Sequence, residues 1–551
     1  MSRLAPTYRP PGPSFRTTSL VGAGIRAFLA SRIRLLNDTR HWKTNSAGIQ
    51  VAQLRNLLRS AAGTDFGRSF GFGKLLDLPS EDLVAAYRKQ VPIGDWIAFK
   101  DRVARMREGA EPDVLWPGLV RDFAQTSGTT AGDKFIPVSD AMLKSNFAAA
   151  MDIFAHAHRF GVSLPSLLAG KVLFLGGSTD LSTSPKGIRT GDLSGIVTPL
   201  IRWPINQIYL PGPDIALLSH WPTKIEAMAK LCLDQDVRMV SGMCSWALVL
   251  FDHLMRMARD QGRRADTLRD LWPNLTLFVH GGVKYAPFDP RVRQAWSGRP
   301  DGQDVPRRLE LYPASEGFVA IQDVPGQPGL RLNVDIGNFL EFVPLERIND
   351  PDPPAFTCDA VEKGQRYVVV LSTCAGLWRY ILGDVVEFDS ICDGLDARTT
   401  GDGPSRIRIV GRHRHFINAF GENLIVENIE NAVARVAREL NLLVGEFTAA
   451  PVYPPTPGLE LAIELDHKDL PAATLTAFSD AFDAALKAEC VDYTIKRTDG
   501  LGMGPPTVTP LPLGAFHRWM ESKGKLGGQH KCPRCANHRD YVDGVRALVE
   551  R

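Results

Sequence analysis

Short apolar runs alternate with amphipathic segments through the middle of this 551-residue chain. The runs predict strands, and each is followed by glycine or by serine and glycine: residues 171–175, 236–240 and 275–280. A helical period follows the second run, over residues 246–259. This alternation is typical of α/β layers in which helices cover a largely parallel sheet. Because ligands bind at the carboxyl ends of such strands, the glycines there mark a candidate site.

The N-terminal part reads as helical and the part after Phe318 as β-rich. Helices are expected over residues 47–61, from Ser80 as an N-cap, and from Ser139–Asp140. The third of these carries an apolar stripe, made of Met142, Phe147, Met151 and Phe154. The other expected features are a turn at 64–67, strands at 119–123, 339–343 and 367–371, and a surface loop at 389–405.

The last part of the chain carries the patterns of a compact α+β domain. A strong amphipathic helix is expected over residues 427–440, a strand over 459–465 and a second helix over 475–489. A chain of this length exceeds what a single core supports. We therefore predict a flexible arm over residues 1–40, a large α/β domain of several subdomains over 41–412, and a small, mobile α+β domain over 413–551.

Composition excludes several classes of protein. Hydrophobic residues make up 44% and charged residues 23%, as in an ordinary globular enzyme, and the net charge of +3 does not argue for a nucleic-acid partner. No run of 18 apolar residues predicts a membrane span. The basic N-terminus has no acidic residue before Asp38, a composition that suits a transit peptide. A flexible arm that leads into an amphipathic helix is favoured. Eight scattered cysteines predict a reduced, cytoplasmic protein.

The candidate phosphate site is the stretch T-S-G-T-T-A-G-D-K-F-I-P at residues 126–137. Its hydroxyls can donate to anionic oxygens, and its glycines let backbone N–H groups approach a ligand. The stretch is not a P-loop, because Phe135 follows Lys134 where a P-loop needs a hydroxyl. A surface turn rich in Ser, Thr and Gly is the alternative. The residues that would hold phosphate are Thr126, Ser127, Gly128, Thr129 and Thr130, with Lys134 as a mobile charge.

Three further segments carry candidate chemistry. In the first, the aromatic Tyr312 could stack on a base beside the small residues Ala314 and Ser315, and Glu316 could hold Mg²⁺. The alternative is a turn at a strand end with an exposed acid. In the second, Asp384 follows a glycine and could accept both ribose hydroxyls; the alternative is a hairpin turn.

The third segment runs over residues 411–422, where the composition shifts between the two predicted domains. It is therefore a candidate hinge, from which Arg412 could reach a nucleotide. An arginine-rich linker that contacts a domain interface is the alternative.

Taken together and in this order, the segments resemble the acyl-adenylate-forming superfamily. The S-G-T-T loop matches its phosphate element, Gly281-Gly282 its second glycine pair, and residues 312–316 its adenine and magnesium element. Gly383-Asp384 matches its ribose element, and residues 411–430 its hinge.

The closer resemblance is to acyl acid amido synthetases, which conjugate plant hormones such as auxin and jasmonate, and to their bacterial relatives. The shared segments run nearly end to end: T-D-F-G-R at 64–68, V-P-I at 91–93, L-W-P-G at 115–118, K-F-I-P at 134–137, Y-x-x-S-E at 312–316, R-Y-x-x-G-D at 379–384 and G-Q-H-K-C-P-R-C at 528–535. The spacing before Lys134 is one residue shorter than in plant members, which weakens the role of this lysine.

The resemblance implies a ligase that uses ATP and Mg²⁺. A small carboxylic acid would first form an acyl-adenylate, and an amino-acid amine would then take the acyl group to give an amide. Ser127, Thr129 and Thr130 would hold phosphates, and Asp384 and Arg412 would hold the ribose. Lys134 and Lys531 would serve catalysis, with a purely structural loop as the alternative for Lys531. Gly281 and Gly282 would lie at the nucleotide. We expect a monomer that binds neither nucleic acid nor membrane.

The acyl pocket and the last cysteines are the least readable parts of the chain. Gly176, Met243 and Trp246 follow strand ends and suit an apolar or aromatic acid, whereas Leu248 to Leu250 are expected to be ordinary core. Cys532 and Cys535, flanked by histidines, allow a zinc knuckle, although ordinary family positions are favoured over a metal or a redox dithiol.

Two other functions stay open at this point. An acyl-CoA ligase would share the adenylation step and differ only in the second nucleophile. A non-catalytic relative would bind a nucleotide or a partner, although intact Ser127, Glu316 and Asp384 argue against it.

Overall fold

The structure is a computed structural model of the whole chain. It describes residues 17–549 except 127–133, 177–180, 202–204, 219, 283, 304, 396–398, 414–415, 418–423, 454–457, 467–470, 491–492, 495–496, 498–502 and 524–531.

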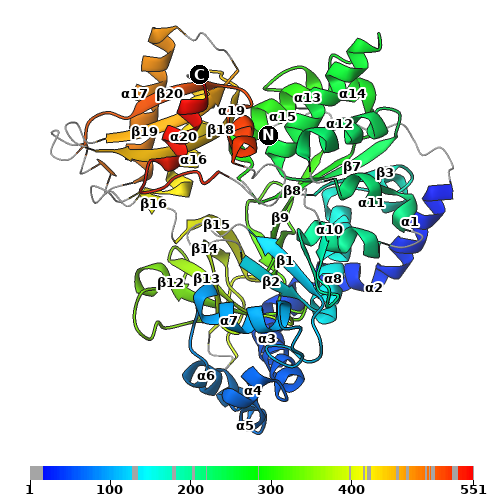
Figure 1. Cartoon of the computed structure of the whole chain (residues 1–551), viewed down its shortest axis with the longest axis vertical. Helices are drawn as coiled ribbons and strands as arrows, with labels where there is room; N and C mark the ends of the chain where they lie inside the picture. The colour runs from blue at the N-terminus through cyan, green and yellow to red at the C-terminus, as the bar shows by residue number, and fades with distance from the viewer. Residues whose placement is uncertain are drawn as a thin grey trace.

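A mixed sheet of eleven strands, counted over the described residues, forms the centre of the molecule (Figure 1). Its order is β12 (Phe339–Pro344), β13 (Arg366–Ser372), β14 (Tyr380–Ser390), β15 (Arg406–Arg412), β11 (Leu330–Leu332), β10 (Gly317–Gln322), β9 (Arg307–Ala314), β8 (Leu277–Gly281), β7 (Val237–Gly242), β3 (Lys171–Leu175) and β6 (Tyr209–Leu210). From β9 to β6 neighbouring strands are parallel, and from β9 to β12 they are antiparallel. The predicted parallel α/β half and β-rich half are therefore two parts of one sheet.

Helices cover both faces of the parallel half of the sheet. Successive residues of a strand point to opposite faces, so the apolar strands place side chains on both faces. Val240 of β7 packs into a core with α12 (Trp221–Cys232), α13 (Cys244–Asp260) and α15 (Asp289–Ser297). The neighbouring Met239 packs on the other side with Ile153 of α8 (Asp140–Ala157). Both faces of the parallel strands are thus buried, as the continuous apolar runs predict.

The N-terminal helices pack around a small second sheet. These helices are α3 (Thr39–Ala61), α4 (Asp65–Ser69), α5 (Phe72–Leu76), α6 (Ser80–Gln90) and α7 (Trp96–Arg107). The sheet has the order β2 (Lys134–Val138), β1 (Asp122–Thr126), β5 (Arg189–Gly191) and β4 (Ser182–Thr183). The chain also has four short helices: α9 (Leu164–Leu167), α10 (Leu193–Val197), α11 (Pro213–Ala216) and α14 (Leu268–Leu271).

Several local predictions need correction. Residues 64–67 do not form a turn, because the Thr64 hydroxyl accepts from the Gly67 N–H (2.9 Å) and caps α4. Ser80 is the first residue of α6 and makes no cap bond. The strand expected at 119–123 begins only at Asp122. Ser139 does cap α8, accepting from the Met142 N–H (3.0 Å).

The apolar stripe predicted for α8 is partly wrong, because Phe147 is 57% exposed. The buried face of α8 includes Ser145, Asp152 and His156 in place of that phenylalanine. Asp152 and His156 are buried because arginines from other elements bind them: Arg32 bonds Asp152 (2.8 Å), and Arg331 lies 3.2 Å from His156. Sequence periodicity does not reveal such partners.

Residues 17–37 are not part of a flexible arm. They form α1 (Thr17–Phe28) and α2 (Ala30–Asn37), with Leu29 and Leu36 buried. Arg32 binds Asp152 and Asp335, which lie 120 and 303 residues away. The basic composition that suggested an arm is therefore matched by distant acids.

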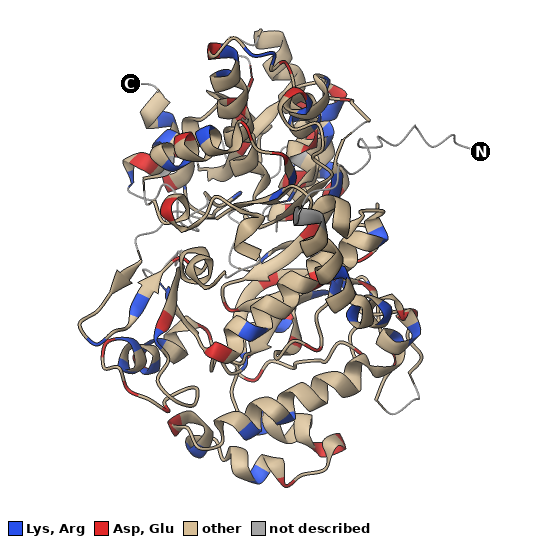
Figure 2. Cartoon of the chain, turned by 90° about the vertical axis from the view of Figure 1, so that its right-hand side faces the viewer, with Lys and Arg blue, Asp and Glu red and all other residues tan. Residues whose placement is uncertain are grey.

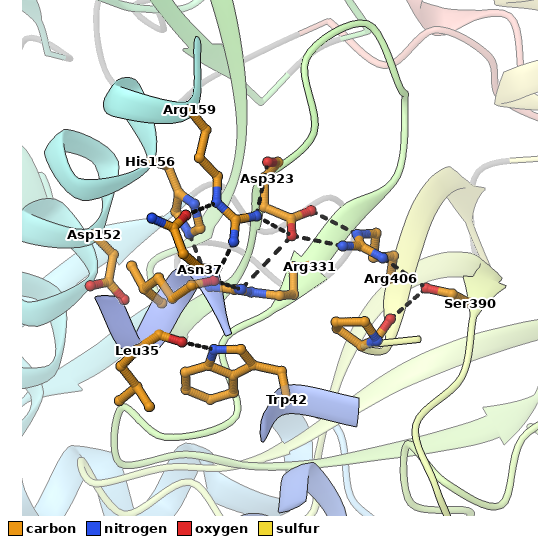
Figure 3. Close-up of polar contacts among 12 residues, drawn as sticks. Leu35, Asn37, Trp42, Asp152, His156, Arg159, Asp323, Arg331, Ser390 and Arg406 are labelled. Carbon is orange, nitrogen blue, oxygen red and sulfur yellow. Dashed lines mark hydrogen bonds and ion pairs between the residues drawn. The ribbon is translucent and has the colours of Figure 1, made fainter. Parts of the chain in front are cut away.

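A buried carboxylate, Asp323, joins four elements near the end of α2 (Figure 3). Its oxygens accept from Arg406 of β15 (2.7 and 2.8 Å) and from Arg159 after α8 (3.2 Å), and Arg331 of β11 lies 3.8 Å away. Arg331 also donates to the carbonyl of Leu36 at the end of α2 (2.9 Å). This cluster fixes α2 and the end of α8 to the antiparallel half of the sheet.

The C-terminal elements gather beside α13 and α15 in Figure 1. They are the sheet β18 (Val444–Val452), β19 (Gly458–Leu465) and β20 (Thr507–Pro512), the helices α16 (Val426–Glu439), α17 (Ala472–Glu489), α19 (Ala515–Ser522) and α20 (Asp540–Val549), and the short pair β16 (Phe416–Ile417) and β17 (Leu424–Ile425). They enclose a core of their own. A domain boundary at residues 412–413 stays a prediction.

No helix among the described residues is both long and apolar enough to cross a membrane. Acidic and basic residues are interspersed along the helices in the view of Figure 2. The expectations of a monomer without nucleic-acid partners stay predictions.

Candidate active site

The β9–β10 connection carries the predicted adenine and magnesium residues. Ala314 pairs with Gly317, so that Ser315 and Glu316 form the turn between the two strands. A side chain at position 317 would place its Cβ 2.9 Å from the Asn338 amide, which explains the glycine. Glu316 and Ser315 are only 9% and 5% exposed. The alternative of a turn with an exposed acid is therefore wrong, since the acid is buried.

Asp384 lies inside β14, between two predicted partners. Its carboxylate accepts from the Tyr312 hydroxyl (2.6 Å) and from Nε of Arg412 (2.7 Å). These partners are 72 and 28 residues away in sequence. The preceding Gly383 has φ +94°, in the region that favours glycine. Asp384 is thus no hairpin turn, and three residues singled out separately in the sequence meet in one place.

The charged groups of this site differ in how well they are paired. The negative charge of Asp384 raises the pKa of Arg412, which stays a cation. Burial raises the pKa of Tyr312 well above its ordinary value, so its hydroxyl remains a donor. Burial also raises the pKa of Glu316, although the charges of Lys134 and Arg412 partly offset this. Glu316 is therefore a buried carboxylate that further positive charge would stabilise.

The two described residues that flank the predicted phosphate loop, Thr126 and Lys134, bring its ends to the site. Ser127, Gly128, Thr129 and Thr130 lie outside the described residues, but Thr126 and Lys134 pair at the ends of β1 and β2. The Lys134 ammonium lies 3.5 Å from the Tyr380 hydroxyl, and its charge acts on Glu316. The described end of the loop therefore reaches the carboxylate predicted to hold Mg²⁺.

Gly281 and Gly282 end β8 beside this site. Gly281 pairs with Leu311, next to Tyr312, and a Cβ there would lie 2.5 Å from the Leu311 carbonyl oxygen. Gly282 has φ +81°. Packing of the strands alone accounts for the first glycine, and contact of either with a nucleotide stays a prediction.

The predicted acyl-pocket residues follow two neighbouring strand ends. Leu175 of β3 pairs with Gly242 of β7, which brings Gly176 and Met243 side by side. Trp246 lies in the first turn of α13, is half-buried and packs against the core that this helix covers. Leu248 and Leu250 are buried, as expected of core residues, whereas Val249 is 39% exposed, so its assignment to the core was wrong. A pocket role for these residues stays a prediction.

Lys531 lies outside the described residues, as does His530. Cys535 is buried, and burial raises the pKa of the Cys532 thiol to about 12. Among the described residues no group of three or more His, Cys, Asp or Glu side chains could hold a metal ion.

Sequence reasoning missed two residues of the site, Tyr380 and His413. The His413 backbone N–H donates to the Gly383 carbonyl (2.9 Å), and its ring Nδ1 lies 3.0 Å from the same oxygen. Tyr380 stands in the R-Y-x-x-G-D segment, where only the aspartate received a role. Both residues stand in sequence segments whose neighbouring residues received a role, and this position could have indicated them.

The fold is that of adenylate-forming ligases. The structure matches that of 2-hydroxyisobutyryl-CoA ligase in the postadenylation state with a TM-score of 0.55, at 14% identity over 93% of this chain and 96% of that one. The match is stronger to an acyl acid amido synthetase, AtGH3.15, solved in complex with 2,4-DB: the TM-score is 0.74, at 17% identity over 98% and 97% of the two chains.

Three models of one family match the chain in order: the GH3 family N-terminal domain over residues 35–204, central domain over 332–395 and C-terminal domain over 427–540. The chain belongs to the GH3 family of acyl acid amido synthetases, a family of ATP-dependent acid–amino acid ligases, which confirms that part of the resemblance. Relatives include jasmonoyl–L-amino acid synthetase JAR6 of Nicotiana attenuata, 22% identical over 90% of this chain and 92% of that protein. Another is the probable indole-3-acetic acid-amido synthetase GH3.1 of Arabidopsis thaliana, 21% identical over 92% of each. The particular resemblance to bacterial members of the family stays a prediction.

Proposed function

We propose that this protein uses ATP to adenylate a small apolar or aromatic carboxylic acid and transfers the acyl group to the amine of an amino acid. The observation that carries the proposal is the contact of Asp384 with Tyr312 and Arg412, beside Glu316 and Lys134. These residues come from four segments and match the nucleotide elements of adenylate-forming enzymes. Family membership supports the amide product.

The chain's own residues suit the first step. Each oxygen of Asp384 already accepts one bond and keeps a lone pair for a ribose hydroxyl. Tyr312 and Arg412 fix the plane of that carboxylate, so the ribose would be held in a single orientation. The phosphates would then lie toward Lys134 and the loop that follows Thr126. In-line attack by a carboxylate needs positioning and charge neutralisation more than covalent help.

Mg²⁺ fits the residues present. It prefers oxygen ligands and is commonly held by one or two carboxylates together with phosphates. Glu316 supplies one buried carboxylate whose charge Lys134 and Arg412 only partly balance. When bound, the ion would neutralise phosphate charge; Glu316 would orient it, and Lys134 would add a charge on the same side.

The residues that follow β3 and β7 suggest the class of carboxylic-acid substrate. Met243 and the half-buried Trp246 offer apolar and aromatic surface, and Gly176 leaves room next to Ser194, whose Oγ would lie 2.7 Å from a Cβ there. The named relatives act on jasmonate or indole-3-acetic acid. An acid with an apolar body is therefore the class to test first.

Product analysis tests the proposal directly. The protein is incubated with ATP and Mg²⁺, a panel of aromatic and aliphatic acids, and either pooled amino acids or coenzyme A, and the products are identified by mass spectrometry. We expect an amide together with AMP and pyrophosphate. A thioester without any amide would show an acyl-CoA ligase, which the fold likeness also allows. Absence of ATP–pyrophosphate exchange with every acid, combined with tight AMP binding, would show a non-catalytic relative.

Replacing Glu316 tests the magnesium role. Glu316→Gln keeps the shape of the turn but removes the charge, so acid-dependent ATP–pyrophosphate exchange is expected to fall by about 10²-fold or more. The loss of exchange activity should become smaller as the Mg²⁺ concentration is raised, because a site of lower affinity still binds the ion at high concentration. The control is Glu346→Gln, an exposed carboxylate that bonds Gln365 (3.1 Å) outside the site. Full exchange by Glu316→Gln at low Mg²⁺ would contradict the assignment.

A further inference from the structure

Charged residues meet where α16 packs against the loop after β8. Lys284, two residues beyond Gly282, lies 3.2 Å from Glu427 and donates to the Asn431 side chain at 2.6 Å. Phe288 lies under the Arg534 guanidinium at 5.5 Å from the ring centre. These contacts join the segment that follows the predicted nucleotide glycines to the C-terminal elements.

Glu430 of α16 is the least satisfied acid at this junction. It is 8% exposed, and its nearest cation is Nε of Arg534 at 3.8 Å, beyond hydrogen-bonding distance. Arg534 gives its own hydrogen bonds to Glu446 (2.6 Å) and to the Phe447 carbonyl (3.2 Å). In the part of the chain that the structure describes, no hydrogen bond reaches the Glu430 carboxylate. A buried carboxylate without donors is costly, unless a ligand supplies them.

Glu310 of β9 reaches the same place from the other side. It pairs with His280 at the end of β8 and stands two residues before Tyr312. Its side chain is 25% exposed, and its nearest recorded cation is Arg308 at 3.9 Å. The buried Nδ1 of His280 also has no partner among the described residues. Two carboxylates with only long contacts to a cation, Glu430 and Glu310, therefore adjoin the predicted nucleotide site from the two sides of the junction.

Among the described residues, the carboxylates at this junction outnumber the cations. The carboxylates are Glu310, Glu427, Glu430 and Glu446, and the cations are Lys284, Arg308 and Arg534. A ligand that brings an ammonium group would supply both the charge and the hydrogen-bond donors that Glu430 lacks.

We propose that this junction receives the amino group of the acceptor, with Glu430 as the proton acceptor and Glu310 as a second carboxylate that holds the ammonium. The proposal rests on the amide-forming function given above. An amino acid arrives as an ammonium ion, whose nitrogen has no lone pair to attack with. Glu430 takes one proton; the nitrogen then attacks the acyl carbon, the C–N bond forms, and the bond to the AMP oxygen breaks with its electron pair. The remaining surplus proton leaves to solvent.

The electrostatics of Glu430 suit that task. Burial raises the pKa of its carboxyl to about 7, with Arg534 and Lys284 opposing the rise and Glu427 and Glu310 adding to it. The neighbouring Cys535 thiol stays neutral, because burial raises its pKa too. A base is most effective when its pKa lies near the working pH. The rate of acyl transfer should therefore rise as pH increases through about 7, as Glu430 becomes ionised.

The test separates adenylation from transfer and uses two nucleophiles. Glu430→Gln, Glu310→Gln and the control Glu439→Gln are compared; Glu439 lies on the same helix, about half exposed, and pairs with Arg435. Acid-dependent ATP–pyrophosphate exchange reports the first step. Transfer from preformed acyl-adenylate is then measured in single turnover, with the amino acid or with hydroxylamine, whose amine is largely neutral at pH 7 and needs no base.

Glu430→Gln is expected to keep exchange and the reaction with hydroxylamine, but to lose about 10²-fold or more in transfer to the amino acid at pH 7. Its remaining rate should lose the rise centred near pH 7. Glu310→Gln is expected to raise the KM for the amino acid more than it lowers kcat. The control should match the wild type in every assay.

Other outcomes distinguish the possible errors. Equal loss with amino acid and with hydroxylamine would show a structural role for Glu430 and overturn the proposal, as would unchanged transfer to the amino acid. Wild-type protein that exchanges ATP but forms no amide would instead overturn the proposed function. Folding is checked by the melting temperature, which should not fall in Glu430→Gln, because Gln removes a buried charge.

Discussion

Asp384→Asn is expected to lower acid-dependent ATP–pyrophosphate exchange by about 10²–10³-fold in kcat/KM for ATP. Asp384 receives a hydroxyl proton on one oxygen and a guanidinium proton on the other. An asparagine can accept at only one of these positions and places an N–H against a donor at the other. It also loses the charge that holds Arg412 in place. The orientation of the ribose and the position of the Arg412 cation beside it would therefore be lost together.

The matched control is Asp389→Asn, on the same strand but outside the site. Asp389 accepts from Nε of Arg408 at 2.7 Å and is partly exposed. We expect its exchange activity to stay within about twofold of the wild type, since exposed pairs contribute little. Equal losses in the two variants would indicate damage to β14 as a whole. Exchange by Asp384→Asn within a few-fold of the wild type would remove Asp384 from the nucleotide site.

Asp323→Asn is expected to be the most destabilising of the proposed changes, costing about 3–5 kcal/mol of unfolding free energy. The Asp323 carboxylate is fully buried, and Arg159, Arg331 and Arg406 all lie against it (Figure 3). The isosteric amide keeps the volume but leaves three guanidinium groups without their shared counter-charge. Burial already lowers the pKa of Arg331 to about 10, and Asp323 opposes that shift. The urea midpoint, followed by circular dichroism, measures the effect.

Asp402→Asn is the control for this change. Asp402 pairs with Lys363, and both side chains are about half exposed. Its loss should cost no more than about 1 kcal/mol, because water screens exposed pairs. If Asp323→Asn unfolded at the same urea concentration as Asp402→Asn, the buried cluster would not anchor α2. Exchange activity of folded Asp323→Asn should remain, since the cluster touches none of the nucleotide residues.

Sequence reasoning reached the site because its elements are local. The Gly383-Asp384 step and the Tyr312 to Glu316 turn are short segments whose residue types reflect backbone geometry and ligand chemistry at one point of the chain. The strands after residue 170 were readable for a similar reason, since a buried parallel strand needs an unbroken apolar run. The start of α8 at Ser139–Asp140 was predicted for the same reason, and Ser139 caps that helix.

Errors arose where a residue's partner is distant in the sequence. Arg32 and its neighbours suggested a flexible arm, because the acids that bind Arg32 lie 120 and 303 residues away. Phe147 was assigned to a buried stripe because hydrophobicity alone cannot show that Asp152 and His156 are held inside by arginines. Glu430, which we propose as the proton acceptor, received no role from the sequence beyond its place in the segment 411–430, because its nearest cation, Arg534, is distant in the sequence.

The sequence by itself determined the alternation of strands and helices, the family, and most of the residues of the proposed nucleotide site. Periodicity, turn chemistry and motif composition are properties of short segments, so they can be recognised without knowledge of the fold. Only the tertiary structure decided which acids are buried, which cations they share and which remain unsatisfied. Burial and pairing are set by segments brought together across hundreds of residues, and the pKa of Glu316 or Glu430 follows from those neighbours and not from the local sequence.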